Sequence, residues 1–234
     1  MDRRKFITST GGIILASQTA SVFGQIELGG PNYDCRMTTR QTAGPYLRPD
    51  SPLRSDIRED RTGVPIQLEV KVIGNRSCEP VEDRIVDIWQ CDSDGLYSAA
   101  KNDVFDPITY RPNGDYIDRS DKTYLRGHQL TDQYGVVSFT TIYPGWYYPR
   151  LTHIHVRVMT PGAEWTTLDT QIYLPMDIEE AVFKKEPYAS RGPNPIDVDK
   201  DGLVKGDTEE VNGLTVDLTP DSDGYKGHIN VVVN

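Results

Sequence analysis

Residues 139–159 read FTTIYPGWYYPRLTHIHVRVM, and the last third of this stretch alternates between polar and apolar side chains as a β-strand does. His153 and His155 stand at positions i and i+2, whereas Ile154 and Val156 fall on the other side. Because side chains two residues apart on a strand point to the same face, the two imidazoles project together. Two imidazoles held side by side can bind one metal ion.

An H-x-H pattern also arises from two solvent-facing histidines, and the residues before the strand bear on the choice. PGWYYPR places a Pro-Gly turn beside Tyr147, Tyr148 and Arg150. A loop of this kind can bring a phenol back over the strand face. An ionised phenol is a hard oxygen donor, so tyrosine and histidine together favour a ferric ion over the softer sites built from Cys and Met.

The N-terminal residues 1–24 have the features of an export signal. Arg3 and Arg4 precede a short apolar stretch and then small residues, a pattern that resembles the twin-arginine type. We therefore expect export by the Tat machinery to the periplasm or the extracellular space, with no membrane segment in the mature protein. An amphipathic N-terminal helix is the alternative.

The net charge limits the classes of partner that the protein can bind, and the number of cysteines indicates the expected disulfide state. The chain of 234 residues carries 25 basic and 35 acidic side chains, a formal charge of −10, which argues against nucleic-acid or anionic-membrane partners. Three cysteines in an exported protein predict one disulfide and one thiol. Their spacing leaves the pairing open among Cys35, Cys78 and Cys91.

The remaining chain reads as many short strands with turns between them and one helix, which predicts an all-β antiparallel β-sandwich with long loops. Residues 25–62 lack periodicity and form either a disordered linker or, as we expect, an N-terminal strap across the domain, and residues 63–234 are expected to form the main domain. A long surface loop is expected over 100–122. Strands are expected within 64–74, 83–92, 124–145, 152–159, 164–175, 214–220 and 227–234, and the helix over 176–186.

Four runs of the sequence carry a resemblance to a known family. They are VDIWQCDSDGLYS at 86–98, YLRG at 124–127, TIYPGWYYPRLTHIH at 141–155 and LDTQIYLP at 168–175. In this order they resemble the intradiol ring-cleavage dioxygenases, the non-haem iron(III) enzymes that open catechol rings between the two hydroxyls. The resemblance extends from about residue 42 to residue 188. It implies the transthyretin-like form of the β-sandwich.

The resemblance assigns roles to individual residues. The metal ligands for Fe(3+) would be Tyr97, Tyr147, His153 and His155, with the P-G-x-Y spacing selecting Tyr147 over its neighbour Tyr148. The catalytic residues besides Tyr147 would be Arg150 and Gln171, beside the substrate. The substrate-binding residues would be Tyr46, Trp146 and Arg150.

The resemblance also implies the reaction: a catecholic substrate and O2 would give a cis,cis-muconate-type diacid. The chain lacks the long helical N-terminal region of the catechol and hydroxycatechol branch, so it is more similar to the compact protocatechuate-type domains. The main alternative is an exported transthyretin-like binding module without catalysis. A zinc hydrolase on the two histidines is a third reading. Any exposed sheet edge could support a homo-oligomer.

Overall fold

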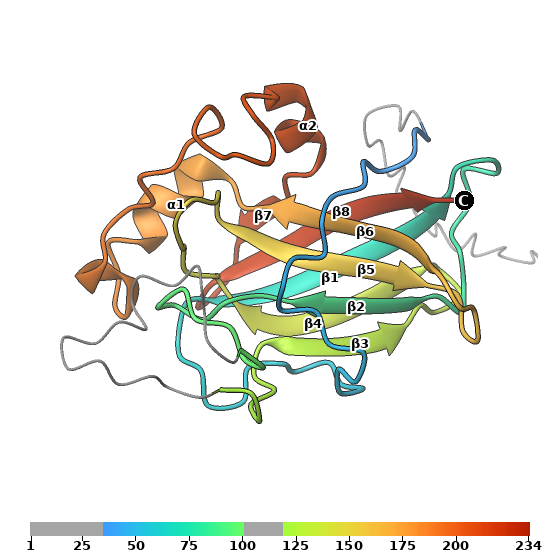
Figure 1. Cartoon of the computed structure of the whole chain (residues 1–234), viewed down its shortest axis with the longest axis horizontal. Helices are drawn as coiled ribbons and strands as arrows, with labels where there is room; N and C mark the ends of the chain where they lie inside the picture. Colours follow the sequence, from blue (N-terminus) through green and yellow to red (C-terminus); the bar gives the residue numbers. More distant parts are fainter. Residues whose placement is uncertain (1–34, 101–118) are drawn as a thin grey trace, which may run out of the picture. The chain divides into compact units, whose positions relative to one another are not determined.

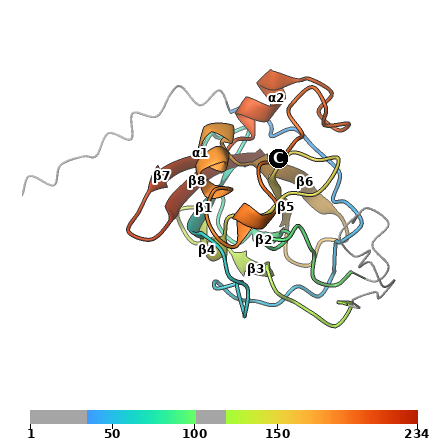
Figure 2. The same cartoon turned by 90° about the vertical axis from the view of Figure 1, so that its left-hand side faces the viewer.

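The computed structural model describes residues 35–100 and 119–234 as two four-stranded sheets packed face to face (Figure 1). The predicted export signal, the start of the predicted strap and most of the predicted 100–122 loop lie outside the described residues. Figure 2 looks along the strands and shows the sheets as two layers. The predicted β-sandwich is therefore confirmed.

The first sheet has the strand order β4-β1-β8-β7. Its strands are β1 (Pro65–Gly74), β4 (Val136–Ile142), β7 (Asp217–Pro220) and β8 (Tyr225–Val233). Its pairings are antiparallel except for β1 with β8, which run parallel. A parallel pair needs a long crossover connection. Here all the strands of the second sheet lie between β1 and β8 in sequence. The alternation of side chains within single strands does not reveal that β1 and β8 pair.

The second sheet has the order β3-β2-β5-β6 and is antiparallel throughout. Its strands are β2 (Ile85–Trp89), β3 (Arg126–Leu130), β5 (His153–Met159) and β6 (Thr166–Tyr173). Alternate residues such as Ile88, Ile154 and Val156 point inward and join the main core with residues of the first sheet. The polar residues between them occupy the opposite face, which carries the site described below.

Residues 35–62 form an irregular strap that follows three strands of the sandwich. The backbone N–H of Gln41 donates to Asp169 on β6, that of Arg54 to His128 on β3, and that of Ile57 to Thr140 on β4. These bonds occupy backbone groups that edge strands otherwise leave unpaired. Ile57 is fully buried in the main core, so the strap is packed into the domain.

The helices are short and lie at the end of the sandwich where β6 ends (Figure 1). The predicted helix is α1 (Met176–Val182), and a 3-10 turn follows at Tyr188–Ser190. The expectation of a single helix was wrong, because α2 (Thr208–Gly213) also forms. The Asp207 side chain caps α2 by accepting from the N–H of Glu210 at 2.9 Å. No helix in the described ranges is both long and apolar enough to cross a bilayer.

A disulfide joins Cys35 at the start of the strap to Cys78 in the turn after β1. Cys91 keeps its thiol, which is buried and donates to the carbonyl oxygen of Gly145 at 3.2 Å. The expected state of one disulfide and one thiol is confirmed, and the structure supplies the pairing that spacing alone left open.

Candidate metal centre

β5 begins with the two histidines, which lie side by side on the polar face of the second sheet. His153 and His155 are 2% and 1% exposed, and their Nε2 atoms are 3.2 Å apart. The Nδ1 of His153 lies 2.6 Å from the carbonyl oxygen of Leu151. A carbonyl oxygen only accepts hydrogen bonds, so Nδ1 of His153 carries the hydrogen. The Nε2 atom of His153 therefore has a free lone pair, which could bind a metal ion.

Two phenols reach the same point from two different loops. Tyr97 follows the turn after β2, and its Oη lies 3.5 Å from Nε2 of His153. Tyr147 lies in the loop before β5, and its Oη is 3.1 Å from the same nitrogen. The competing phenol, Tyr148, is 59% exposed. Geometry therefore favours Tyr147, as the P-G-x-Y spacing does.

The four donor atoms are spaced as one metal ion requires. Donors that each lie about 2.1 Å from an ion are about 3.0 Å apart at a right angle and about 3.4 Å at the tetrahedral angle. The distances from Nε2 of His153 to the other three donors, 3.1, 3.2 and 3.5 Å, fall near this range. Across the described ranges no three His, Cys, Asp or Glu side chains converge on a metal position, so a metal held here would take phenol oxygens.

Burial keeps all four donors uncharged when no cation is present. It holds the pKa of His153 well below its usual value and lowers the pKa of His155 to about 3. It raises the pKa of both Tyr97 and Tyr147 above 10, although the charge of Arg150 partly opposes this at Tyr147. Neutral imidazoles are ready to bind a cation, and the phenols must lose their protons to do so.

Aromatic rings and the strap enclose the donors. Trp89 stacks on His155 with 4.9 Å between ring centroids, and Tyr46 stacks on Tyr97 at 4.3 Å. Gly44 has a φ of +69°, and a Cβ at this position would lie 3.1 Å from Cε1 of His155. The strap thus forms a close wall over the polar face of the sheet.

Arg126 links the strap by hydrogen bonds to the loop that carries Tyr97. Its side chain is fully buried and donates to the carbonyl oxygen of Tyr46 at 3.0 Å and to the carbonyl oxygen of Ser98 at 2.8 Å. Burial lowers its pKa to about 10. These contacts give Arg126 a structural role beneath the site.

Arg150 and Gln171, both predicted at the site, contact each other. The Nη2 of Arg150 donates to Oε1 of Gln171 at 2.6 Å, and its Nε donates to Asp201 at 2.9 Å. Burial lowers the pKa of Arg150, but nearby anionic groups, including Asp201, outweigh this and raise it. The sequence did not predict that Asp201 belongs to the site, because nothing near it in sequence distinguishes this buried aspartate from the exposed acidic residues around it.

Trp146, predicted to contact substrate, is turned toward the loop after the 3-10 turn. Its Nε1 donates to the carbonyl oxygen of Gly192 at 2.9 Å, and Arg191 stacks on its ring at 4.3 Å. It packs against the main core, whereas Tyr46 packs against Tyr97 itself. The substrate-binding role of Trp146 stays a prediction.

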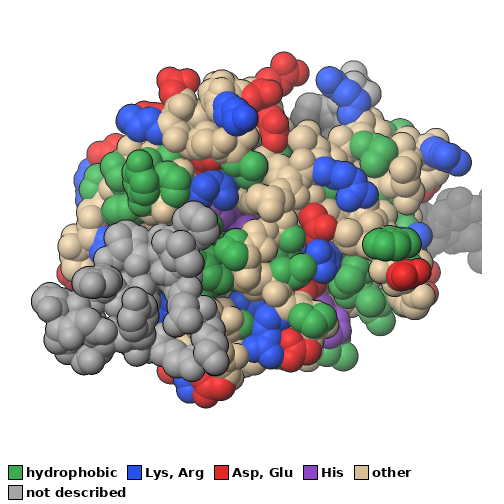
Figure 3. Space-filling model, viewed as in Figure 1, with side chains coloured by type: hydrophobic (Ala, Val, Ile, Leu, Met, Phe, Trp, Pro, Cys, Tyr) green, Lys and Arg blue, Asp and Glu red, His purple; other side chains and the backbone are tan. Residues whose placement is uncertain are grey.

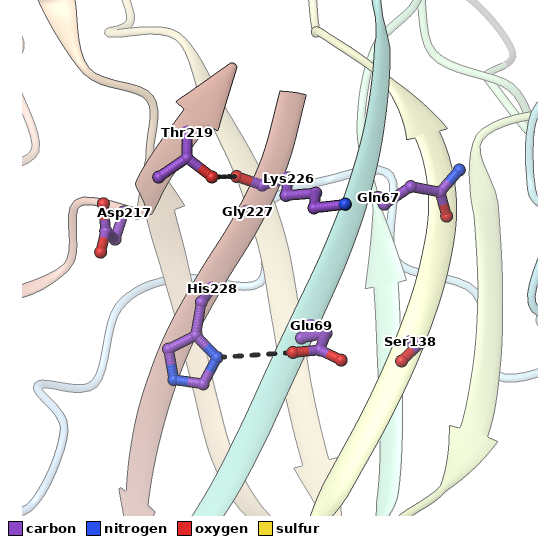
Figure 4. Close-up of a pocket in the computed structure, with 8 residues that line it drawn as sticks. All are labelled: Gln67, Glu69, Ser138, Asp217, Thr219, Lys226, Gly227 and His228. Atoms are coloured by element: carbon purple, nitrogen blue, oxygen red, sulfur yellow. Dashed lines mark hydrogen bonds and ion pairs between the residues drawn. The ribbon is translucent and has the colours of Figure 1, made fainter. Parts of the chain in front are cut away.

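The other two histidines, His128 and His228, have other neighbours than the four candidate ligands. Nδ1 of His128 lies 2.7 Å from the carbonyl oxygen of Ser51. His228 lines a polar groove on the outer face of the first sheet, where its Nδ1 is 3.9 Å from Glu69 (Figure 4).

Comparison with known proteins identifies the family of the chain. A family model described as "Dioxygenase" matches residues 42–208. Chlorocatechol 1,2-dioxygenase of Cupriavidus pinatubonensis is 32% identical over 144 residues, covering 58% of this chain and 54% of that protein. The chain thus spans about half the length of that relative. Hydroxyquinol 1,2-dioxygenase of Rhodococcus opacus is 27% identical over 250 aligned residues, covering 94% of this chain and 71% of that protein.

Solved structures show the same sandwich. The intradiol ring-cleavage dioxygenase from Tetranychus urticae is 25% identical with a TM-score of 0.72, covering 86% of this chain and 95% of that chain. The dioxygenase domain of a dioxygenase carbohydrate-binding protein fusion from Streptomyces sp. SirexAA-E is 28% identical with a TM-score of 0.56, covering 85% and 99%.

The fold and the pair of tyrosines beside the pair of histidines define the class of this protein as a β-sandwich with a candidate metal centre of phenol and imidazole groups. Since the family match covers most of the chain, this protein belongs to the intradiol ring-cleavage dioxygenase family.

Proposed function

We propose that the protein is an intradiol dioxygenase, which cleaves a catechol-type ring between its two hydroxyls with O2 and gives a cis,cis-muconate-type diacid. Both oxygen atoms of O2 enter the product, so no other oxidant or reductant is needed. The observation that carries the proposal is the convergence of two phenol oxygens and two imidazole nitrogens at one buried point beside a guanidinium.

Tyr97, Tyr147, His153 and His155 would hold the iron. The donor set fits Fe(III), because two phenolate oxygens are hard anionic ligands and two neutral imidazoles complete the group. When bound, ferric iron supplies a Lewis-acidic centre that favours the ionised form of a catechol and its reaction with O2.

Residues of the chain would accept a proton from the substrate and stabilise its negative charge. A catechol that binds as a dianion must lose two protons. The Oη of Tyr147 is a suitable acceptor for one of them, because burial raises the pKa of this phenol and so favours its protonated form. Tyr147 is also less buried than Tyr97, which gives its ring more room to move.

Arg150 would stabilise negative charge on the substrate, and Gln171 would fix the orientation of its guanidinium. On the face of the molecule in Figure 3, acidic and basic side chains are interspersed and form no patch of one sign. Recognition of an anionic substrate then depends on local groups such as Arg150, because that face provides no broad attractive field.

A visible absorption spectrum of the iron-loaded protein tests the proposal. Tyrosinate bound to Fe(III) should give a broad charge-transfer band, which should move to longer wavelength when catechol is added without oxygen. Tyr97→Phe should weaken the band and abolish turnover, whereas the matched control Tyr148→Phe should leave both unchanged. A colourless protein that takes up no iron would instead favour a binding module that keeps only the fold.

We also propose export by the twin-arginine route to the periplasm or beyond. The proposal rests on Arg3 and Arg4, and the Cys35–Cys78 disulfide supports it because disulfides persist in oxidising compartments. Replacing both arginines by lysine should retain the protein in the cytoplasm, as cell fractionation would measure. Equal export of the two forms would contradict this route.

A further inference from the structure

The guanidinium of Arg150 is held along one edge by a carboxylate that is far away in sequence. Asp201 is fully buried. Its Oδ2 accepts from Nε of Arg150 at 2.9 Å and from the backbone N–H of Leu151 at 2.7 Å. Its Oδ1 accepts from the backbone N–H of Leu203 at 2.8 Å, and also lies 3.1 Å from Nε of Arg150. Both oxygens are therefore occupied by donors of the chain itself.

A second group holds the other side of the same guanidinium. Oε1 of Gln171 accepts from Nη2 of Arg150, and Nε2 of Gln171 donates to the carbonyl oxygen of Thr42 in the strap at 2.9 Å. The remaining nitrogen, Nη1, has no hydrogen-bond partner in the part of the chain that the structure describes. Two of the three nitrogens are thus fixed, and the third is left for a ligand.

We propose that Asp201 is a positioning residue that orients Arg150 toward the substrate, a role that rests on the function proposed above. Its hydrogen bonds to Arg150 are charge-assisted, because both partners carry charge, and such bonds are about twice as strong as neutral ones. Since Asp201 is buried, water does not screen this pair as it screens an exposed one. Gln171 completes the orientation from β6.

The same carboxylate also supports a metal ligand. Asp201 accepts from the N–H of Leu151, and the carbonyl oxygen of Leu151 accepts from Nδ1 of His153 at 2.6 Å. One buried side chain therefore fixes both Arg150 and the backbone that orients an imidazole. Its loss should affect substrate affinity first, through the direct bond to Arg150, and His153 only through this backbone relay.

The sequence around Asp201 also resembles a different kind of site, a calcium-binding loop, which the structure does not support. Asp197, Asp199 and Asp201, followed by Gly202, have the spacing of a calcium-binding loop. However, Asp197 pairs with Lys200, Asp201 points inward to Arg150, and the described residues contain no cluster of three such ligands. The pattern here positions an arginine.

The proposal is tested by labelling Arg150 and by kinetics, with Asp201→Asn as the variant. Asp197→Asn is the matched control, because it makes the same change four residues away at an exposed ion pair. The rate at which p-hydroxyphenylglyoxal modifies Arg150, followed by peptide mass spectrometry, reports how firmly its guanidinium is held. This rate needs neither iron nor turnover, and Arg150 is only 14% exposed in the parent protein.

We expect Asp201→Asn to raise the labelling rate of Arg150 at least about tenfold and to lower kcat/KM for catechol by about 10- to 100-fold, mainly through KM. The double variant with Arg150→Ala should lose much less than the sum of the two single losses, because Asp201 acts mainly through Arg150 and only weakly through the Leu151 backbone. A merely structural role would give additive losses. Asp201→Ser, which also removes the charge, replaces Asp201→Asn if the latter does not fold.

Unchanged labelling of Arg150 in a folded Asp201 variant would overturn the proposal, and so would a double variant in which the two losses in kcat/KM add. A parent protein that binds iron but turns over no catechol would instead overturn the proposed function. The labelling rate would still decide in that case whether Asp201 holds Arg150.

Discussion

Replacing Asp87 by Asn should change how the stability of the protein depends on pH. Asp87 lies on β2 at the polar face of the second sheet and is 3% exposed. Burial raises its pKa from 3.8 to about 7, although Ser51, Arg126 and Arg157 partly oppose the shift. Its Oδ1 has no hydrogen-bond partner among the described residues. The folded protein therefore holds a carboxyl that prefers to be protonated.

The sign follows from comparing the folded and unfolded states. A carboxyl whose pKa is higher in the folded state contributes nothing unfavourable below pH 3.8, and destabilises the fold increasingly as pH rises to about 7. The full difference corresponds to about 4 kcal/mol, of which about 3 kcal/mol falls between pH 5 and pH 8. Asparagine has the same shape but does not ionise, so Asp87→Asn removes this penalty.

Urea unfolding of the iron-free parent and variant at pH 5 and pH 8 measures the effect. The stability of Asp87→Asn relative to the parent should rise by about 3 kcal/mol between the two pH values. Contributions from His153 and His155 are present in both proteins and cancel in the difference. Asp223→Asn, at an exposed turn, is the control and should show no such rise. Parallel pH profiles for Asp87→Asn and the parent would refute the reasoning.

Three further predictions concern the strap. Ile57→Ala, which truncates a fully buried side chain, should lower the free energy of unfolding by about 3 kcal/mol in urea, and a loss near zero would mean that the strap is not packed as described. Replacing Cys35 and Cys78 by serine opens a loop of 43 residues and should cost about 4 kcal/mol, a cost that should vanish when both proteins are compared under reducing conditions. Gly44→Ala places a Cβ against His155 at a φ of +69°, so it should lower iron content per chain as measured by metal analysis. Undiminished iron would contradict the close approach.

Local signals predicted much of the fold, and the resemblance to a known family supplied most of the candidate site. The alternation around His153 and His155 placed both imidazoles on one face, and the structure brings their Nε2 atoms within 3.2 Å. The resemblance to the family, through its P-G-x-Y spacing, selected Tyr147, and the structure exposes its competitor Tyr148. The alternation depends on neighbours within a few residues, which is the range over which sequence patterns carry physical information.

The features that could not be predicted all depend on contacts between distant residues. Cys35 pairs with Cys78 because the strap returns to the turn after β1. The parallel pairing of β1 with β8 likewise depends on how the chain closes after the second sheet has formed. Asp201 is fully buried only because its loop folds back over Arg150, so its role cannot be read from the acidic run around it.

The strap encloses the candidate metal centre, although the four predicted ligands all lie in the sandwich that follows it. Without Gly44 and Tyr46 the polar face of the second sheet would be open to water at His155 and Tyr97. Water would then weaken the attraction between these groups and a bound cation, because electrostatic interactions are stronger where water is excluded. The family match also begins within the strap, at residue 42. A chain shortened to residues 63–234 should therefore lose iron even where its sheets still form, because donors need a dry enclosure as well as correct spacing.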